Sequence, residues 1–166
     1  MSKTLVDFDL RQNLRFRDHW VEVIRSAITV LSPEDVLQFH AKIHPSYWLD
    51  ELFDSTYRHV AFQDGPDHYI VQYYRSVAAN AVFHVDCRKI QERMAVRQVF
   101  HLIHHTFKFD SGPPQFEVWC ADVPFSMLEE LEKQNVPFLT DASSGKQFII
   151  TIPPQKSRVL PWVGAK

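Results

Sequence analysis

The alternation of apolar and polar residues is clearest between Asn80 and Ile152, where it predicts a strand, a helix, a strand, a helix and a strand. The strands are expected at Ala81–Asp86, Gln115–Ala121 and Gln147–Ile152, and the helices at Lys89–Phe107 and Pro124–Gln134. The longer helix has apolar residues at spacings of three and four, which is typical of a helix that buries one face. Everything upstream can be interpreted as packing onto this unit.

The upstream pattern predicts a more mixed series of elements. We expect a helix over Leu14–Ile24, a short strand over the β-branched run Ala27–Leu31, and a helix over Pro33–Ile43 that is capped by the preceding serine. A second helix is expected over Tyr47–Tyr57. Two β-rich runs then flank the turn sequence D-G-P-D and predict a hairpin, with strands at Arg58–Phe62 and His68–Tyr74.

Length and composition predict an ordinary globular domain. The chain has 166 residues, of which 45% are hydrophobic and 23% charged, and this length is typical of one domain with a real core. The net charge of -2 argues against a dedicated nucleic-acid binder, which usually carries a basic face. No apolar run reaches the ~18 residues that a membrane span needs. With only two cysteines, Cys87 and Cys120, we expect free thiols in a reducing cytoplasm.

The order of elements from Ala27 onward, β-α-α-β-β-β-α-β-α-β, resembles the fold of the GNAT family of N-acetyltransferases. The run I-T-V-L-S-P-E-D-V-L-Q-F looks like the first strand and helix of that family, and Met127–Gln134 followed by V-P-F is similar to the helix before the family's usual G-F strand. The layout also resembles GNAT-like internal virion proteins of short-tailed phages. The resemblance covers residues 25–152 and implies an α+β fold with one mixed central sheet flanked by helices. Residues 1–24 would form an N-terminal extension with a helix, and residues 153–166 a C-terminal tail.

This resemblance assigns roles to particular residues. On the fourth strand of the family, His84 or Asp86 would be the general base. At the start of the main helix, Arg88, Lys89 and Arg93 would attract the phosphates of acetyl-CoA. The family cradles these phosphates with glycines, but the run from 87 to 95 contains none. The tyrosine that often serves as its acid also lacks a counterpart, because no Tyr follows Tyr74.

Histidine and cysteine offer other candidate chemistry. His101 and His105, and likewise His40 and His44, have the i, i+4 spacing that clamps a metal on a helix, but no converging carboxylate can be named, so we favour a polar helix face and predict no metal. Cys87 is followed by two basic residues that would lower its pKa, yet the strand geometry favours a half-buried structural thiol.

We therefore expect a non-catalytic GNAT-like module that acts in assembly or protein–protein interaction, such as a structural component of a phage virion. The alternative that stays open is an acyl-CoA-dependent N-acyltransferase with a divergent phosphate loop. Other protein subunits are the expected partners, without nucleic acid or membrane. Leu160 and Trp162 in the tail are the expected interface residues. The expected location is the cytoplasm, or the virion if the chain comes from a phage.

Overall fold

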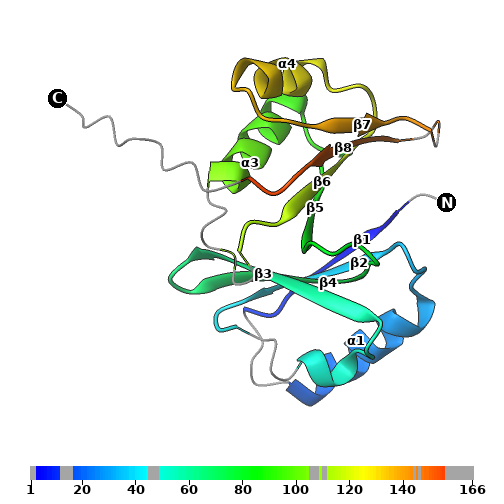
Figure 1. Cartoon of the computed structure of the whole chain (residues 1–166). Coiled ribbons are helices and arrows are strands. Elements are labelled where there is room, and N and C mark those ends of the chain that lie inside the picture. The colour runs from blue at the N-terminus through cyan, green and yellow to red at the C-terminus, as the bar shows by residue number, and fades with distance from the viewer. Residues whose placement is uncertain are drawn as a thin grey trace.

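The fold consists of two halves, each built around a four-stranded sheet. The computed structural model describes residues 3–11, 17–44, 49–104, 109, 112–143, 145 and 147–155. Figure 1 shows the first sheet (sheet A) below the second (sheet B), with α1 beneath sheet A, α4 above sheet B and α3 to the left of sheet B. The chain is therefore an α+β protein, as the sequence predicts, but it has two sheets where one central sheet was expected.

The elements of the two halves follow in strict chain order. The first half contains β1 (Leu5–Asp9), α1 (Arg17–Val30), β2 (Val36–Ala41), the 3-10 turn η2 (Asp50–Leu52), β3 (Tyr57–Gly65) and β4 (His68–Arg75). The second half contains β5 (Val82–Asp86), α3 (Glu92–His104), β6 (Gln115–Cys120), α4 (Phe125–Lys133), β7 (Leu139–Asp141) and β8 (Phe148–Ile152). The predicted unit Asn80–Ile152 is confirmed in element type and order, and so is the hairpin of β3 and β4.

The two sheets have the same topology. Sheet A has the order β1-β2-β4-β3 and sheet B the order β5-β6-β8-β7. In each sheet the first two strands are parallel and joined by a helix, and the remaining neighbours are antiparallel. The halves therefore repeat one β-α-β unit followed by a hairpin.

Two predictions for the first half are wrong. The segment Ala27–Leu31, expected as a strand, lies mostly in α1, and Pro33–Ile43, expected as a helix, contains strand β2. The apolar residues of β2 fit either repeat, but they alternate in space. Leu37 and Phe39 pack on the α1 side of the sheet, whereas Val36 packs toward the second half.

The expected helix cap at Ser32 is instead a turn that begins β2. The Asp35 carboxylate accepts hydrogen bonds from the backbone N–H groups of Ser32 and Thr4, both at 2.9 Å. Because Thr4 precedes β1, this one side chain joins the starts of two parallel strands. Residues 1–24 were expected to form an extension, yet within them β1 is the edge strand of sheet A.

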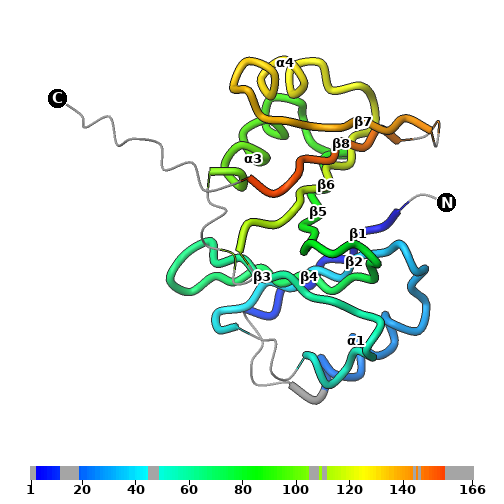
Figure 2. Tube along the Cα trace, in the orientation of Figure 1, coloured from blue at the N-terminus to red at the C-terminus, as the bar shows by residue number. Residues whose placement is uncertain are grey.

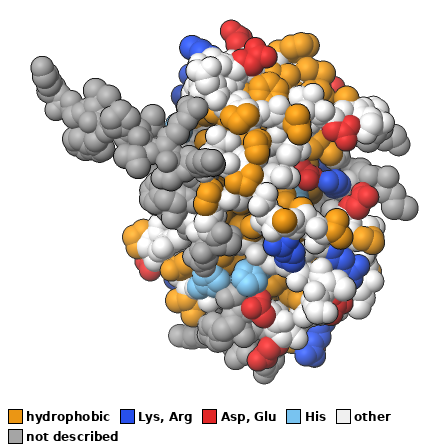
Figure 3. All heavy atoms as spheres, viewed as in Figure 1, with side chains coloured by type: hydrophobic (Ala, Val, Ile, Leu, Met, Phe, Trp, Pro, Cys, Tyr) orange, Lys and Arg blue, Asp and Glu red, His pale blue; other side chains and the backbone are white. Residues whose placement is uncertain are grey.

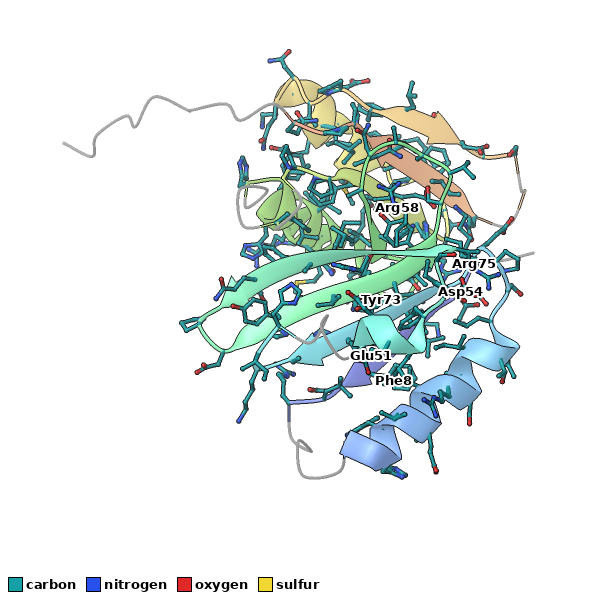
Figure 4. The ribbon with its side chains drawn as sticks, turned by 60° about the horizontal axis from the view of Figure 1, so that its bottom comes forward. Phe8, Glu51, Asp54, Arg58, Tyr73 and Arg75 are labelled. Carbon is teal, nitrogen blue, oxygen red and sulfur yellow. The ribbon has the colours of Figure 1, made fainter. Side chains whose placement is uncertain are left out.

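The lower face of sheet A is covered by α1 and η2, as Figure 4 shows. Tyr73 stands between the sheet and η2, where its hydroxyl donates a 2.6 Å hydrogen bond to Asp50 and its ring stacks on Phe53 at 4.1 Å. Phe8 stacks on Phe39 on the same side. The expected helix Tyr47–Tyr57 is reduced to this short turn in its described part, and residues 45–48 lie outside the described residues.

The upper face of sheet A meets β5, the edge strand of sheet B that lies nearest to it (Figure 2). Gln72 is fully buried, and its amide donates to the C=O of His84 and accepts from the N–H of His84, both at 2.8 Å. The Tyr74 hydroxyl accepts from the N–H of Val82 at 2.8 Å. Side chains of β4 thus satisfy backbone groups that an edge strand would otherwise leave unpaired.

Among the described residues, none of the helices is both long and apolar enough for a membrane crossing.

Candidate functional site

A cleft of about 220 Å³ lies between the upper face of sheet A, the edge of β5 and helix α3. Its apolar walls include Leu5, Phe62, Ile70 and Leu102. Its polar groups come from both halves: Gln38, His40 and Asp64 from the first, and His84, Asp86, Gln98 and His101 from the second. The structure thus brings the two predicted base residues, His84 and Asp86, into one cleft with histidines that the sequence analysis had not connected to them.

A chain of carboxylates and imidazoles runs beside this cleft, and its members His40, Asp64 and His101 line the cleft; we call it the carboxylate–histidine chain. His40 Nε2 lies 2.9 Å from Asp7 Oδ1, and His40 Nδ1 lies 2.9 Å from His68 Nε2. His68 Nδ1 is 3.5 Å from Asp64 Oδ2, and His101 Nε2 is 3.1 Å from Asp64 Oδ1. In Figure 3, histidine side chains (pale blue) lie next to each other in the lower half of the molecule, which contains sheet A.

Strand register explains how these distant residues meet. His40 pairs with Asp9 of β1 and with Ile70 of β4, so the three side chains lie on the same face of sheet A. His68 starts β4 two residues before Ile70 and therefore points to that same face. Asp64 lies near the end of β3, at the turn of the same hairpin. Of the residues in the carboxylate–histidine chain, only His101, on α3, belongs to the second half.

His84 is held in a structural setting. Its backbone is bound by Gln72, and its ring packs against Tyr74 at 5.0 Å and Trp119 at 5.7 Å. Burial lowers the pKa of His84 to about 4, although Glu117 opposes the shift. The imidazole is therefore neutral at pH 7, and its Nδ1 is 3.2 Å from the Gln72 amide oxygen.

Asp86 and Arg88 are paired with each other. The Arg88 guanidinium donates hydrogen bonds of 2.7 and 2.8 Å to the Asp86 carboxylate, and the Arg88 backbone N–H donates a third at 3.1 Å. Arg88 also donates to the carbonyl oxygen of Lys3 at 2.7 Å. The Arg88 guanidinium lies 5.0 Å from the ring centre of Trp119. Burial raises the pKa of Asp86, but the hydrogen bonds from Arg88 outweigh it and the net pKa is lowered. The predicted base and the first predicted phosphate ligand thus neutralise each other.

The start of α3 is the place where acyl-CoA phosphates would bind in the GNAT interpretation. Lys89 and Arg93 are exposed there. Glu92 occupies the first turn of the helix, and its carboxylate accepts a 2.6 Å hydrogen bond from the N–H of Ser126. The carboxylate thus binds the first turn of α4, and its negative charge beside the start of α3 would repel a phosphate there.

Cys87 corrects one expectation. Its basic neighbours were expected to lower its pKa, but burial raises the pKa of the Cys87 thiol to about 12, with a smaller contribution from Cys120. Both cysteines are free and buried. The alternative interpretation, a structural thiol, fits this environment.

A metal site finds no support in the described part of the chain, which contains no group of three or more His, Cys, Asp or Glu placed to hold an ion. His40 lies on strand β2 and not on a helix, so its spacing to His44 does not place the two one turn apart. His101 lies on α3, but His105, like Leu160 and Trp162, lies outside the described residues.

Exposed apolar side chains gather near the first turns of α3 and α4; we call this group the apolar corner. It comprises Ile90, Met94, Val123 and Phe125, which are between 40% and 75% exposed. The bond between Ser126 and Glu92 brings the two helix starts together. Figure 3 shows hydrophobic side chains at the top of the molecule, over α4. From the sequence, this region was predicted to bind a cofactor, and the apolar corner was not predicted.

Comparisons with protein-family models, with curated proteins and with solved structures found no match to this chain.

Proposed function

We propose that this chain is a non-catalytic module that acts in assembly by binding a partner protein through the apolar corner. The observation that carries the proposal is the exposure of Phe125, 75% of whose surface is open to solvent at the start of a helix. Large exposed aromatic residues with apolar neighbours are typical of protein–protein contacts.

The groups that acyl transfer would need are engaged in other bonds, which supports an interaction role. His84 is buried against Tyr74 and Trp119, and Asp86 is paired with Arg88. If the Arg88 side chain turned away to bind a phosphate, the partly buried Asp86 carboxylate would lose its partner. Such a loss is costly because the carboxylate would remain desolvated.

The partner expected at the apolar corner is a protein segment that presents apolar side chains flanked by carboxylates. Lys89 and Arg93 border the corner and are exposed. Neither makes a salt bridge within the part of the chain that the structure describes. Carboxylates of the partner would meet these cations and thereby set the orientation of the apolar contact.

Site-specific photo-cross-linking in the cells that naturally make the protein tests this proposal. A photoreactive phenylalanine analogue at position 125 is expected to give a discrete adduct with a partner protein, identified by mass spectrometry. Adding Met94→Asp, which places a charge in the corner, should lower the adduct yield about tenfold. Adducts that persist unchanged in Met94→Asp would contradict the proposal.

Val77 offers a matched control. It is an exposed aliphatic residue in the loop between β4 and β5, away from the corner. The same analogue at position 77 is expected to give no discrete adduct. Equal adducts at positions 77 and 125, or none at 125, would show that the corner does not bind a partner.

The GNAT-like scaffold remains part of this proposal. The second half has the order of strand, helix, strand, helix and strands that the resemblance predicts, and β5 and β6 are parallel neighbours. This supports a GNAT-like origin for that half, with an assembly role such as that of a virion component. The alternative, an acyl-CoA-dependent acyltransferase, is favoured by one observation: Lys89 and Arg93 are exposed at the start of α3.

A further inference from the structure

We propose that His40 and His68 bind one proton in common, and that uptake of a second proton separates the two rings and loosens the sheet A side of the cleft. The two facing nitrogens are only 2.9 Å apart, and the rings stack with an angle of 22° between their planes. This pair is the centre of the carboxylate–histidine chain. Its function would be to make the cleft sensitive to pH, independently of any partner at the apolar corner.

The geometry allows one proton between the two rings. His40 Nε2 lies 2.9 Å from the Asp7 carboxylate and donates to it, and the other nitrogen of His40, Nδ1, faces His68 Nε2 at 2.9 Å. One proton between these facing nitrogens makes a hydrogen bond. A proton on each of them places N–H against N–H, which is repulsive.

Charged groups of both signs surround the pair. Asp7 and Asp9 approach from β1 and Asp64 from β3, whereas Arg11 and His101 are the basic groups that face it. The pKa of His68 is lowered, first by burial and then by the charges of Arg11 and His40, while Asp64 and Asp9 oppose the shift. The second proton is therefore resisted by the first.

The carboxylate–histidine chain does not have the geometry of a metal site. Metal ligands converge on one point, but His40 and His68 each use their two nitrogens to bridge different neighbours. The bridges extend in a line from Asp7 on β1 to His101 on α3. A line of this kind transmits a change in protonation along the cleft, because the Asp64 contact with His101 joins sheet A to the second half.

Nuclear magnetic resonance of the ring nitrogens between pH 4 and pH 9 tests the shared proton. The facing nitrogens, Nδ1 of His40 and Nε2 of His68, are expected to respond together to one proton. The second proton should bind at least about two pH units lower, as in other strongly coupled pairs. Independent titration of the two rings over one pH range, with no response common to the facing nitrogens, would overturn the proposal.

Hydrogen exchange tests the loosening. Ala41 pairs with Tyr69 at the end of the β2–β4 ladder. Protection of the backbone amides there should fall about tenfold once the pH is low enough for the second proton to bind. His68→Asn removes the second charge and should abolish this fall. His104 is exposed and is not a member of the carboxylate–histidine chain, so His104→Asn is the matched control and should leave the fall in protection unchanged. Wild-type protection that does not change with pH would contradict the opening.

Discussion

Replacement of Gln72 with leucine is expected to lower the free energy of unfolding by about 3–5 kcal/mol. The substitution leaves the N–H and the C=O of His84 buried without partners, and each such group costs about 1–3 kcal/mol. Gln38 also loses the 2.7 Å hydrogen bond that its side-chain oxygen accepts from Gln72. Urea denaturation followed by circular dichroism measures the change.

Two further variants check that the loss of stability comes from the hydrogen bonds between β4 and β5. Tyr74→Phe removes only the acceptor for the N–H of Val82, so a smaller loss of about 1–2 kcal/mol is expected. Gln98→Leu, an exposed glutamine on α3, should change the stability by less than about 0.5 kcal/mol. A loss below about 1 kcal/mol for Gln72→Leu would mean that Gln72 does not hold β5 against sheet A.

The stability of the protein is expected to fall by about 3 kcal/mol between pH 6.5 and pH 4 on account of His84 alone. Its pKa is lowered from the ordinary 6.5 to about 4 by burial. In this window the unfolded chain binds a proton at His84 and the folded chain does not, so acid favours unfolding and stability rises with pH. Urea denaturation at half-unit pH steps gives the curve.

His84→Phe isolates this contribution, because phenylalanine keeps an aromatic ring beside Tyr74 and Trp119 but does not titrate. The variant should lose most of the slope between pH 6.5 and pH 4. The lowered pKa values of Asp86 and Glu117 act on a different window, since their stabilisation is lost only as the pH falls below about 4. An unchanged slope in the variant would show that His84 is not buried in the neutral form.

The second half could be predicted because its patterns are local and unambiguous. Helix α3 buries Val99, Phe100 and Ile103 at helical spacing, and the first four residues of β6 alternate between partly buried polar and buried apolar side chains. In the first half the apolar residues of β2 fit both a helix and a strand. Their true repeat is decided by α1 and by the pairing with β1 and β4, which are distant in sequence.

The candidate site was predictable only in part. The polar residues of β5, His84 and Asp86, stand out in an apolar strand and do reach the cleft. Their partners cannot be deduced from spacing. His40 meets His68 through strand register, and Gln72 reaches His84 across two sheets. The one available signal was the set of polar residues at Asp7, Gln38 and His40, whose alternation within short strands marks one polar face.

Isothermal titration calorimetry with acetyl-CoA and desulfo-CoA tests most directly the claim that the cleft groups serve the structure and not acyl transfer. Because Arg88 is paired with Asp86 and Glu92 occupies the start of α3, we expect no binding tighter than a Kd of ~1 mM. A micromolar Kd that weakens about tenfold in Lys89→Ala or Arg93→Ala, but not in the control Lys133→Ala, would contradict this account and favour the acyltransferase.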